Sequence, residues 1–383
     1  MSLSATSLAD ILRLRRELHR HPERSGCEEK TAHRIESFIK TQSPDDLLTG
    51  LGGFGIAAVF DSGTVGPSVL LRAELDAVPI QEAGERPHRS TVTSISHACG
   101  HDGHMAILCA LAAQLARCRP VKGRVVLLFQ PAEETGAGAA KVLSDPRFRA
   151  IAPDHAFALH NLPGFPEGTV VIRAGQFCPA SMGIVVRLQG KAAHAAQPET
   201  GRSPALSMCR IVEGLTEIGR NPDAPGSLPL ATVVHARLGE PGAFGMAPGS
   251  AVVMATLRSE TDRGLSDVVN RGIGMAESAA AEARVALEIE RRDPFPATVN
   301  TEMETAVVAA AAAAGGLPIH RLAHPLPWSE DFGRFTGRFG GVLFGLGAGR
   351  AIADLHHPDY DFPDSLIPRG SALFQSILDQ LLD

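Results

Sequence analysis

The sequence is poor in aromatic residues and has no excess of positive charge. Its 383 residues include one Trp, one Tyr and 16 Phe, which leaves little material for platforms that stack on nucleic-acid bases. Lys and Arg total 36 against 42 Asp and Glu, a formal net charge of −6, whereas phosphate binding needs clustered cations. These two shortages argue against nucleic acid as a partner.

Long hydrophobic runs and paired cysteines are also missing. No run of about 18 apolar residues occurs, and residues 1–10 are polar, so we expect neither a membrane span nor a secretion signal. The six cysteines form no Cys-x-x-Cys pair, which is typical of a reducing compartment. We therefore expect a cytoplasmic protein without a membrane partner, in which a special cysteine is a ligand or a nucleophile.

What is present is a globular composition, 44% hydrophobic and 20% charged, in a chain long enough for two to three domains at roughly 150 residues each. Apolar residues at helical spacing predict two helices within residues 8–40, broken at His21-Pro22. Further along, short apolar runs flank a helical stretch, an alternation typical of an α/β sheet with covering helices. The runs are 55–60, 68–72, 125–129 and 156–159, and the helix is 103–118.

The pattern changes at about residue 179. Strand 182–188, helix 203–219, strands 231–237 and 250–258, helix 265–283 and strand 284–291 follow one another, the ferredoxin-like order β-α-β-β-α-β. The earlier pattern then resumes with helix 302–314, strand 341–347 and helix 371–382. We predict an α/β protein of two domains. The larger one, residues 1–178 and 293–383, is a mixed sheet with covering helices, and the inserted one, residues 179–292, is ferredoxin-like.

The densest chemical signal is the block His-Ala-Cys-Gly-His-Asp-Gly-His at residues 97–104. So many polar groups are costly to bury in an apolar core without partners. Transition metals prefer imidazole nitrogen and thiolate sulfur, and Cys99 with His101 supplies both on one loop. The alternative is a polar loop in which Asp102 caps a helix that begins near Gly103.

A second signal is the acidic pair Glu133-Glu134, which follows the strand 125–129. Taken alone, the pair is better explained as a solvated helix start, because carboxylates favour the first helical turn. Beside a metal, the two residues divide the work, since Glu134 coordinates while Glu133 takes a proton from water. That division is what a hydrolase needs.

Several single residues near strand ends are ambiguous by themselves. His160 and the pair His356-His357 are each weak candidates for ligands, and Asp76 either orients a ligand imidazole or caps a turn before Pro79. Glu330 and Asp331 lack an obvious partner and suit a solvated loop equally well. In the inserted domain, His194 lies among small residues that leave space for a ligand, although an exposed loop histidine is as good an explanation.

Together these residues resemble the M20 family of metallohydrolases, in particular its amidohydrolase branch of hippurate hydrolases, N-acyl-amino-acid aminoacylases and plant auxin-conjugate hydrolases. The block at 97–104 is intact, the block Phe-Gln-Pro-Ala-Glu-Glu occupies 129–134, and the match extends to the final His-x-Pro segment. The resemblance implies a zinc-peptidase-like catalytic domain with two divalent metal ions, zinc being expected and manganese, cobalt or nickel the alternatives. The implied ligands are Cys99, His101, Glu134, His160 and His356.

The resemblance also implies roles for other residues. Glu133 is the expected general base and Asp76 the orienting carboxylate, while His356 is preferred to His357 because the family pattern is histidine, one variable residue, then proline. Residues 179–292 become a lid that dimerises. In that dimer His194 helps to polarise the scissile carbonyl at a neighbouring active site, and Arg258 binds a substrate carboxylate. We therefore expect a homodimer acting on a small molecule.

The sequence departs from the family pattern at residues 245–248. Relatives usually show Asn-Val-Ile-Pro there, whereas this chain has Gly-Met-Ala-Pro, so the amide that would hydrogen-bond the substrate is missing at Gly245. Position 74 is glutamate where aspartate is typical, and Trp328 stands where a smaller residue is common. Because a site that loses a polar anchor loses discrimination, these departures bear on the identity of the substrate.

The leading hypothesis is metal-dependent hydrolysis of the amide bond of a small N-acyl amino acid or related conjugate, through water activated by two metals. Enzymatic alternatives are a dipeptidase or an arylamine deaminase that uses the same centre. Gly245 also suggests a non-catalytic metal-binding or ligand-binding relative. A further alternative is that Cys99 acts as a nucleophile beside His101.

Overall fold

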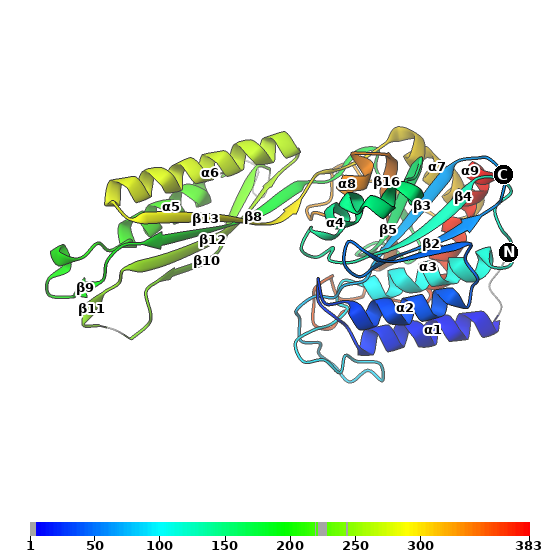
Figure 1. Ribbon diagram of the computed structural model, residues 1–383, viewed down its shortest axis with the longest axis horizontal. Coiled ribbons are helices and arrows are strands. Elements are labelled where there is room, and N and C mark those ends of the chain that lie inside the picture. Colours follow the sequence, from blue (N-terminus) through cyan, green and yellow to red (C-terminus); the bar gives the residue numbers. More distant parts are fainter. Residues whose placement is uncertain (1–4, 219, 221–227, 243) are drawn as a thin grey trace. The chain divides into compact units, whose positions relative to one another are not determined.

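The computed structural model describes residues 5–218, 220, 228–242 and 244–383 (Figure 1). The chain divides into two compact units, of which the first comprises Met1–Phe177, Thr298–Pro325 and Glu330–Asp383, and the second comprises Cys178–Ala297 and Leu326–Ser329. No described helix is long and apolar enough to cross a lipid bilayer.

Unit 1 is built around one mixed sheet of eight strands in the order β1-β2-β4-β3-β5-β16-β6-β15. Strands β4, β3, β5 and β16 run parallel to one another, and β1, β2 and β6 are antiparallel to neighbours. The strands of this sheet are β1 (Asp46–Leu51), β2 (Gly55–Asp61), β3 (Ser68–Glu74), β4 (Arg124–Gln130), β5 (His155–Pro163), β6 (Val170–Ile172), β15 (Ile319–Arg321) and β16 (Gly340–Gly349). A two-stranded sheet pairs β7 (Gly175–Cys178) with β14 (Thr298–Asn300).

Helices cover both faces of this sheet (Figure 1). The apolar helix α3 packs on β3 and is buried along its whole length, with α1, α2 and α9 packed around it in one hydrophobic core. Helices α4 and α8 lie on the opposite face. The bounds are α1 (Ala5–Arg20), α2 (Glu29–Lys40), α3 (His101–Leu115), α4 (Gly138–Ser144), η1 (Pro146–Ile151), α7 (Glu302–Ala314), α8 (Gly333–Thr336) and α9 (Leu366–Leu382).

Unit 2 is a four-stranded antiparallel sheet in the order β10-β12-β8-β13, with α5 and α6 on one face (Figure 1). Its elements are β8 (Ala180–Gln189), β9 (Ala193–His194), η2 (Pro198–Thr200), α5 (Ala205–Glu217), β10 (Leu230–Leu238), β11 (Met246–Ala247), β12 (Ser250–Ser259), α6 (Asp262–Ala283) and β13 (Ala286–Phe295). The long elements follow the order strand, helix, strand, strand, helix, strand. Gly219, the last residue of the helix expected at 203–219, lies outside the described residues.

This architecture confirms the predicted α/β class, and the differences lie at element ends. The helix expected from residue 103 begins at His101, and Asp102 sits inside its first turn, so the interpretation of Asp102 as the helix cap is wrong. The strand expected from residue 284 begins at Ala286, because Arg284 ends α6 in the left-handed conformation. Strands β6 and β15 were not expected, since three residues are too few for a pattern, and the six-residue edge strand β1 was missed as well.

Candidate metal centre

The parallel strands of unit 1 bring the predicted site residues to one edge of the sheet. Arg72 of β3 pairs in register with Leu128 of β4 and with Ala158 of β5. Two residues further along, β3 and β4 end and β5 reaches His160. Parallel strands end at a common edge, where ligands bind in open α/β sheets. As a result Asp76, Glu133 and His160, although far apart in the sequence, lie next to one another with the start of α3.

Three overlapping sets of donors form the centre, and one of them, His101 with Glu133 and Glu134, includes the carboxylate expected to be the base. The other two share Cys99. Cys99, His101 and His160 make one set and Cys99, Glu134 and His356 the other, and the donor atoms within each set lie within 4.8 Å of one another. Cys99 Sγ is 3.5 Å from His160 Nε2, and Glu134 Oε1 is 3.7 Å from His101 Nε2 and 3.4 Å from His356 Nε2. The structure therefore brings together all five residues expected to bind metal.

The two buried histidines each present one nitrogen to the centre. His101 Nδ1 donates to the backbone carbonyl of Asp76 at 2.8 Å, and His160 Nδ1 donates to the carbonyl of Asn161 at 2.9 Å. A carbonyl oxygen accepts only, so each bond fixes the proton on Nδ1 and leaves the Nε2 lone pair available. His101 and His160 are thus held in the tautomer that a metal requires.

The backbone determines which of the adjacent residues His356 and His357 faces the other donors. His356 has a φ of +62°, and its N–H donates to the carbonyl of Ala98 at 2.8 Å, which turns its side chain toward Glu134. The ring of His357 instead accepts from the N–H of Asp359 at 3.1 Å within its own loop. The structure places His356, not His357, among the donors.

Asp76 and Glu133 occupy the positions around these donors. Asp76 is fully buried, and its Oδ2 accepts from the Ser25 hydroxyl at 2.6 Å and from the Glu134 N–H at 3.0 Å. Glu133 is buried and its Oε2 lies 3.9 Å from His101 Nε2. The residues after β4 form turns rather than a helix start, so the interpretation of Glu133-Glu134 as a solvated helix start is wrong.

Electrostatics at the centre favour a bound cation. Burial and then the charges of Glu134 and Glu133 raise the pKa of Cys99 well above its ordinary value. Burial and then Glu330 and Glu134 raise the pKa of Glu133 in the same way. Both shifts arise because negative charges lie close together in a buried site, and bound divalent cations would offset that repulsion.

The pKa of His101 reflects the same crowding of carboxylates. Burial by itself lowers its pKa, but Glu74, Asp76 and Glu134 outweigh that effect and raise the pKa to about 10. Buried His101 Nε2, Glu134 Oε1 and Asp76 Oδ1 have no hydrogen-bond partner among the described residues. Buried polar atoms without partners are rare in proteins, so the donor set fits metal ions.

A buried ion cluster behind the centre was not expected from the sequence. The guanidinium of Arg72 contacts Glu74, Glu330 Oε1 at 2.9 Å and Asp331 Oδ1 at 2.8 Å. Glu330 and Asp331 are buried, so the solvated-loop alternative for them is wrong. The partner was missed because Arg72 lies within a strand some 260 residues away, where sequence spacing carries no information.

A second polar cluster joins α1 to α3 and to the segment after His356. His19 Nδ1 lies 2.8 Å from Asp102 Oδ2 and its Nε2 lies 3.3 Å from Glu82 Oε1, while Arg15 contacts Asp102 and Asp361. Both nitrogens of His19 are engaged by carboxylates, which outweigh burial and raise its pKa to about 9. These contacts tie α1 to the start of α3 and to the segment after His356.

The residues predicted in the inserted region lie in unit 2. His194 is exposed at the end of β9, where it pairs with Met246 of β11, and the carbonyl of Gly245 accepts from the N–H of Ala195 at 2.9 Å. A Cβ built on Gly245 would meet no described atom within 4 Å. Arg258 is partly buried on β12 and donates to the Ser329 hydroxyl at 2.9 Å.

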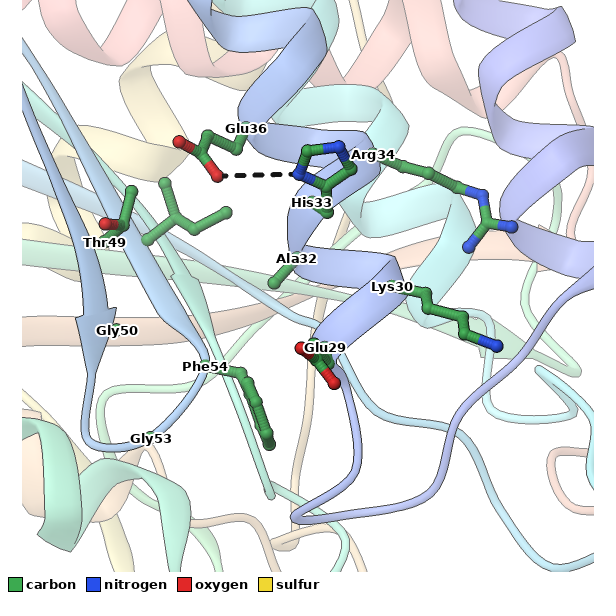
Figure 2. Close-up of a pocket in the computed structure, with 11 residues that line it drawn as sticks. Glu29, Lys30, Ala32, His33, Arg34, Glu36, Thr49, Gly50, Gly53 and Phe54 are labelled. Atoms are coloured by element: carbon green, nitrogen blue, oxygen red, sulfur yellow. Dashed lines mark ion pairs between the residues drawn. The ribbon is translucent and has the colours of Figure 1, made fainter.

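A groove of about 690 Å³ elsewhere in unit 1 shares no residue with the metal centre. It lies between α2 and the turn that joins β1 to β2 (Figure 2). Figure 2 shows its mixed lining, with Phe54 beside Glu29 and the ion pair between His33 and Glu36 on its rim. Its charges are mixed and its walls are open, and it presents no convergent set of donors.

The sequence is similar to a known family and to proteins of named activity. A model described as peptidase family M20/M25/M40 matches residues 70–380. N-acetyl-L-cysteine deacetylase of Bacillus subtilis is 31% identical over 97% of this chain and 88% of its own length. IAA-amino acid hydrolase ILR1-like 2 of Arabidopsis thaliana is 30% identical over 97% and 85%.

Solved structures share the complete fold. A Bacillus subtilis protein described as a dinuclear metal binding peptidase from the M20 family superimposes with a TM-score of 0.80 and 25% identity, covering 99% of both chains. The similarity extends over both units of the present chain.

Proposed function

The chain belongs to peptidase family M20/M25/M40 and is a metal-dependent amidohydrolase of that family, and from this premise we propose that it hydrolyses the amide bond of a small N-acylated amino acid or related conjugate. The observation that carries the proposal is the pair of donor sets that share Cys99, with an additional buried carboxylate, Glu133, beside them. Hydrolysis needs both a Lewis acid and a base, and this arrangement offers a place for each.

Five residues would hold the two ions: Cys99, His101, Glu134, His160 and His356. Their mixture of sulfur, nitrogen and oxygen suits zinc, with manganese, cobalt or nickel as alternatives. When bound, the ions supply Lewis acidity, which lowers the pKa of water and polarises the substrate carbonyl.

Glu133 is the proposed general base. Its carboxylate lies 3.9 Å from His101 Nε2, so it is within reach of water at the centre, and it takes the proton of the attacking water. It then returns this proton to the departing amine. Asp76 contributes from behind His101, because its backbone carbonyl accepts from Nδ1 and its side chain carries negative charge 3.6 Å from the same nitrogen.

Two residues of unit 2 complete the proposal. The exposed imidazole of His194 is free to donate to the carbonyl oxygen of a substrate at a neighbouring active site in a homodimer that forms through unit 2. The guanidinium of Arg258 is suited to a substrate carboxylate, since its planar fork of N–H groups matches two carboxylate oxygens. An amino acid with a free carboxylate is the corresponding product.

Similar proteins support this substrate class. One relative is named for deacetylation of N-acetyl-L-cysteine and another for hydrolysis of an IAA-amino acid. Each name describes an amino acid that carries an acyl group. Gly245 adds no side chain beside His194, so the acyl or amine portion of the substrate for this chain is set by other contacts.

The test is metal analysis of the purified protein combined with a chromatographic screen of N-acyl amino acids, dipeptides and aryl amines. We expect bound divalent metal and release of an amino acid from at least one N-acyl member. Release of amino acids from dipeptides alone would favour a dipeptidase, and release of ammonia from aryl amines a deaminase. Tight metal uptake without turnover of any member would indicate a non-catalytic relative.

A further inference from the structure

The loop between α1 and α2 touches the metal centre at two points that the sequence did not suggest. The hydroxyl of Ser25 donates to Asp76 Oδ2 at 2.6 Å. Three residues later, Glu28 Oε1 accepts from the backbone N–H of Ala132 at 2.8 Å. One short loop therefore contacts both the carboxylate behind His101 and the turn that carries Glu133 and Glu134.

The turn at Ala132 has an unusual backbone. Ala132 has a φ of +51°, in the left-handed region that L-residues with a side chain rarely adopt. Its carbonyl accepts from Gly138 N–H at 2.9 Å, and the carbonyl of Glu133 accepts from Gly136 N–H at 2.7 Å. Strained backbone persists where the surroundings determine it, and the hydrogen bond from Ala132 to Glu28 is one such determinant.

Glu28 stands at the N-cap position of α2 but does not cap the helix. It precedes the first residue of α2, yet its side chain makes no capping bond to that helix. Oε1 accepts from Gly26 N–H at 2.8 Å and from Ala132, whereas the buried Oε2 has no hydrogen-bond partner among the described residues. A fully buried carboxylate with half its oxygens unbonded costs stability, so its presence calls for another reason.

We propose that Glu28 is a positioning residue for the metal centre, which holds the left-handed turn at Ala132 so that Glu134 and Glu133 face the other donors. Ser25 supports the same geometry through Asp76, whose Oδ2 also accepts from Glu134 N–H at 3.0 Å. The inference rests on the proposed function, since it takes Glu134 as a ligand and Glu133 as the base. Without the hydrogen bond from Ala132 N–H to Glu28, the side chains of Glu133 and Glu134 are no longer held in one orientation.

The test compares Glu28→Ala, Glu28→Asp and Glu28→Gln in the full-length protein. The matched control is Glu29→Ala, because Glu29 is the adjacent exposed carboxylate on the groove of Figure 2. Each protein is stripped with a chelator, and Zn²⁺ affinity is measured by competition with a chromophoric chelator. The visible spectrum of the Co²⁺ form reports the coordination geometry, and thermal unfolding of the metal-free protein is recorded in parallel.

Glu28→Ala and Glu28→Asp are expected to weaken the metal site that includes Glu134 by about 10-fold or more and to alter the Co²⁺ spectrum. Glu28→Gln keeps an oxygen that accepts from Ala132 N–H, so it should stay within about threefold of wild type, as should the control. Adding Ala132→Gly to Glu28→Ala should recover part of the affinity, because glycine adopts positive φ without strain.

Two outcomes overturn the proposal. If metal affinity and the Co²⁺ spectrum are unchanged while only the unfolding temperature falls, Glu28 is merely structural. If the metal-free Glu28→Ala protein fails to fold, Glu28→Asp decides, and wild-type affinity in that variant counts against positioning. A wild type that binds no metal overturns both proposals, whereas one that binds metal and hydrolyses no substrate overturns the proposed function alone.

Discussion

The sheets of the two units bury their side chains differently. In unit 1 every residue of β3, and all but the first of β4, is buried on both faces, because helices cover both sides. In unit 2 β12 alternates between buried and more accessible residues, because α5 and α6 cover one face. Side chains of the first sheet are therefore buried on both faces, whereas one face of the second sheet stays more accessible.

This difference decides what polar residues can do in each unit. Glu74, Asp76 and His101 are fully buried at the end of the unit 1 sheet, where an unpaired charge is expensive. Both histidines of unit 2, His194 and His235, are exposed. Substitutions of the donor residues in unit 1 should therefore change stability, metal binding and catalysis together, whereas substitutions in unit 2 should change contact with the substrate alone.

The largest expected effect is the loss of activity on chelation. If the donors of unit 1 act through metal, removal of the ions should reduce turnover to background, and added Zn²⁺ or Mn²⁺ should restore it. Turnover is followed with a substrate identified in the screen. The same experiment distinguishes a metal-ligating Cys99 from a nucleophilic one. Activity that survives chelation but is abolished by thiol alkylation would indicate the nucleophile.

Glu133→Gln should separate catalysis from metal binding within unit 1. The amide cannot take a proton, so kcat should fall by about 10²–10⁴-fold, the range attributed to general bases. Bound metal, measured by elemental analysis, should be unchanged because the ligands remain. Glu29→Ala is the exposed control and should retain activity. Full activity of Glu133→Gln would exclude Glu133 as the base.

His194→Ala should sharpen the contrast between the units. Loss of one donor to the substrate carbonyl should lower kcat/KM by about 10²-fold. Since His194 is exposed, the free energy of unfolding should change by no more than about 0.5 kcal/mol and metal content should not change. His33→Ala is the matched exposed histidine of unit 1 (Figure 2). Equal kcat/KM in both variants would remove His194 from the mechanism.

The last expected effect is on stability rather than on activity, in the cluster around His19. The folded-state pKa of His19 is raised to about 9, above its ordinary value of 6.5. Its contribution is therefore fully present below pH 6.5 and is lost as the pH rises through 9. The loss should reach at most about 3 kcal/mol. Urea unfolding followed by circular dichroism at pH 7 and pH 9.5 measures it.

His19→Gln provides the comparison for this titration. The variant has no imidazole to titrate, so its free energy of unfolding should depend less steeply on pH between 7 and 9.5 than that of the wild type. Parallel curves for the two proteins would show that the His19–Asp102 pair does not govern alkaline stability.

Local sequence patterns were sufficient to predict most of the longer helices and strands. The alanine-rich helix α7 lies at the residues expected, 302–314, because nothing in that stretch interrupts helical spacing. Helix α9 begins five residues earlier than expected, at Leu366, since Pro368 lies in its first turn, where the missing N–H costs nothing. The strands β6 and β15 were missed because three residues are too few for periodicity.

The site was only partly predictable. The block at residues 97–104 concentrates several donors in a short segment, so Cys99 and His101 could be predicted as ligands from the sequence. Arg72 and Glu28 did not, because each is a single charged residue whose partners, Asp331 and Ala132, lie far along the chain. An isolated charge on a strand or before a helix looks the same in sequence whether it is solvated or buried.

The sequence by itself determined which atoms are available to this protein: a thiol, imidazoles and carboxylates placed immediately after strands, few aromatic groups and no excess of cationic ones. Tertiary structure decided which of them meet. Parallel pairing of β3, β4 and β5 placed Asp76, Glu133 and His160 at one edge, where burial together with neighbouring charges and hydrogen bonds shifted their pKa values. The reason is that chemical identity is local, whereas proximity and desolvation depend on residues that only the folded chain brings together.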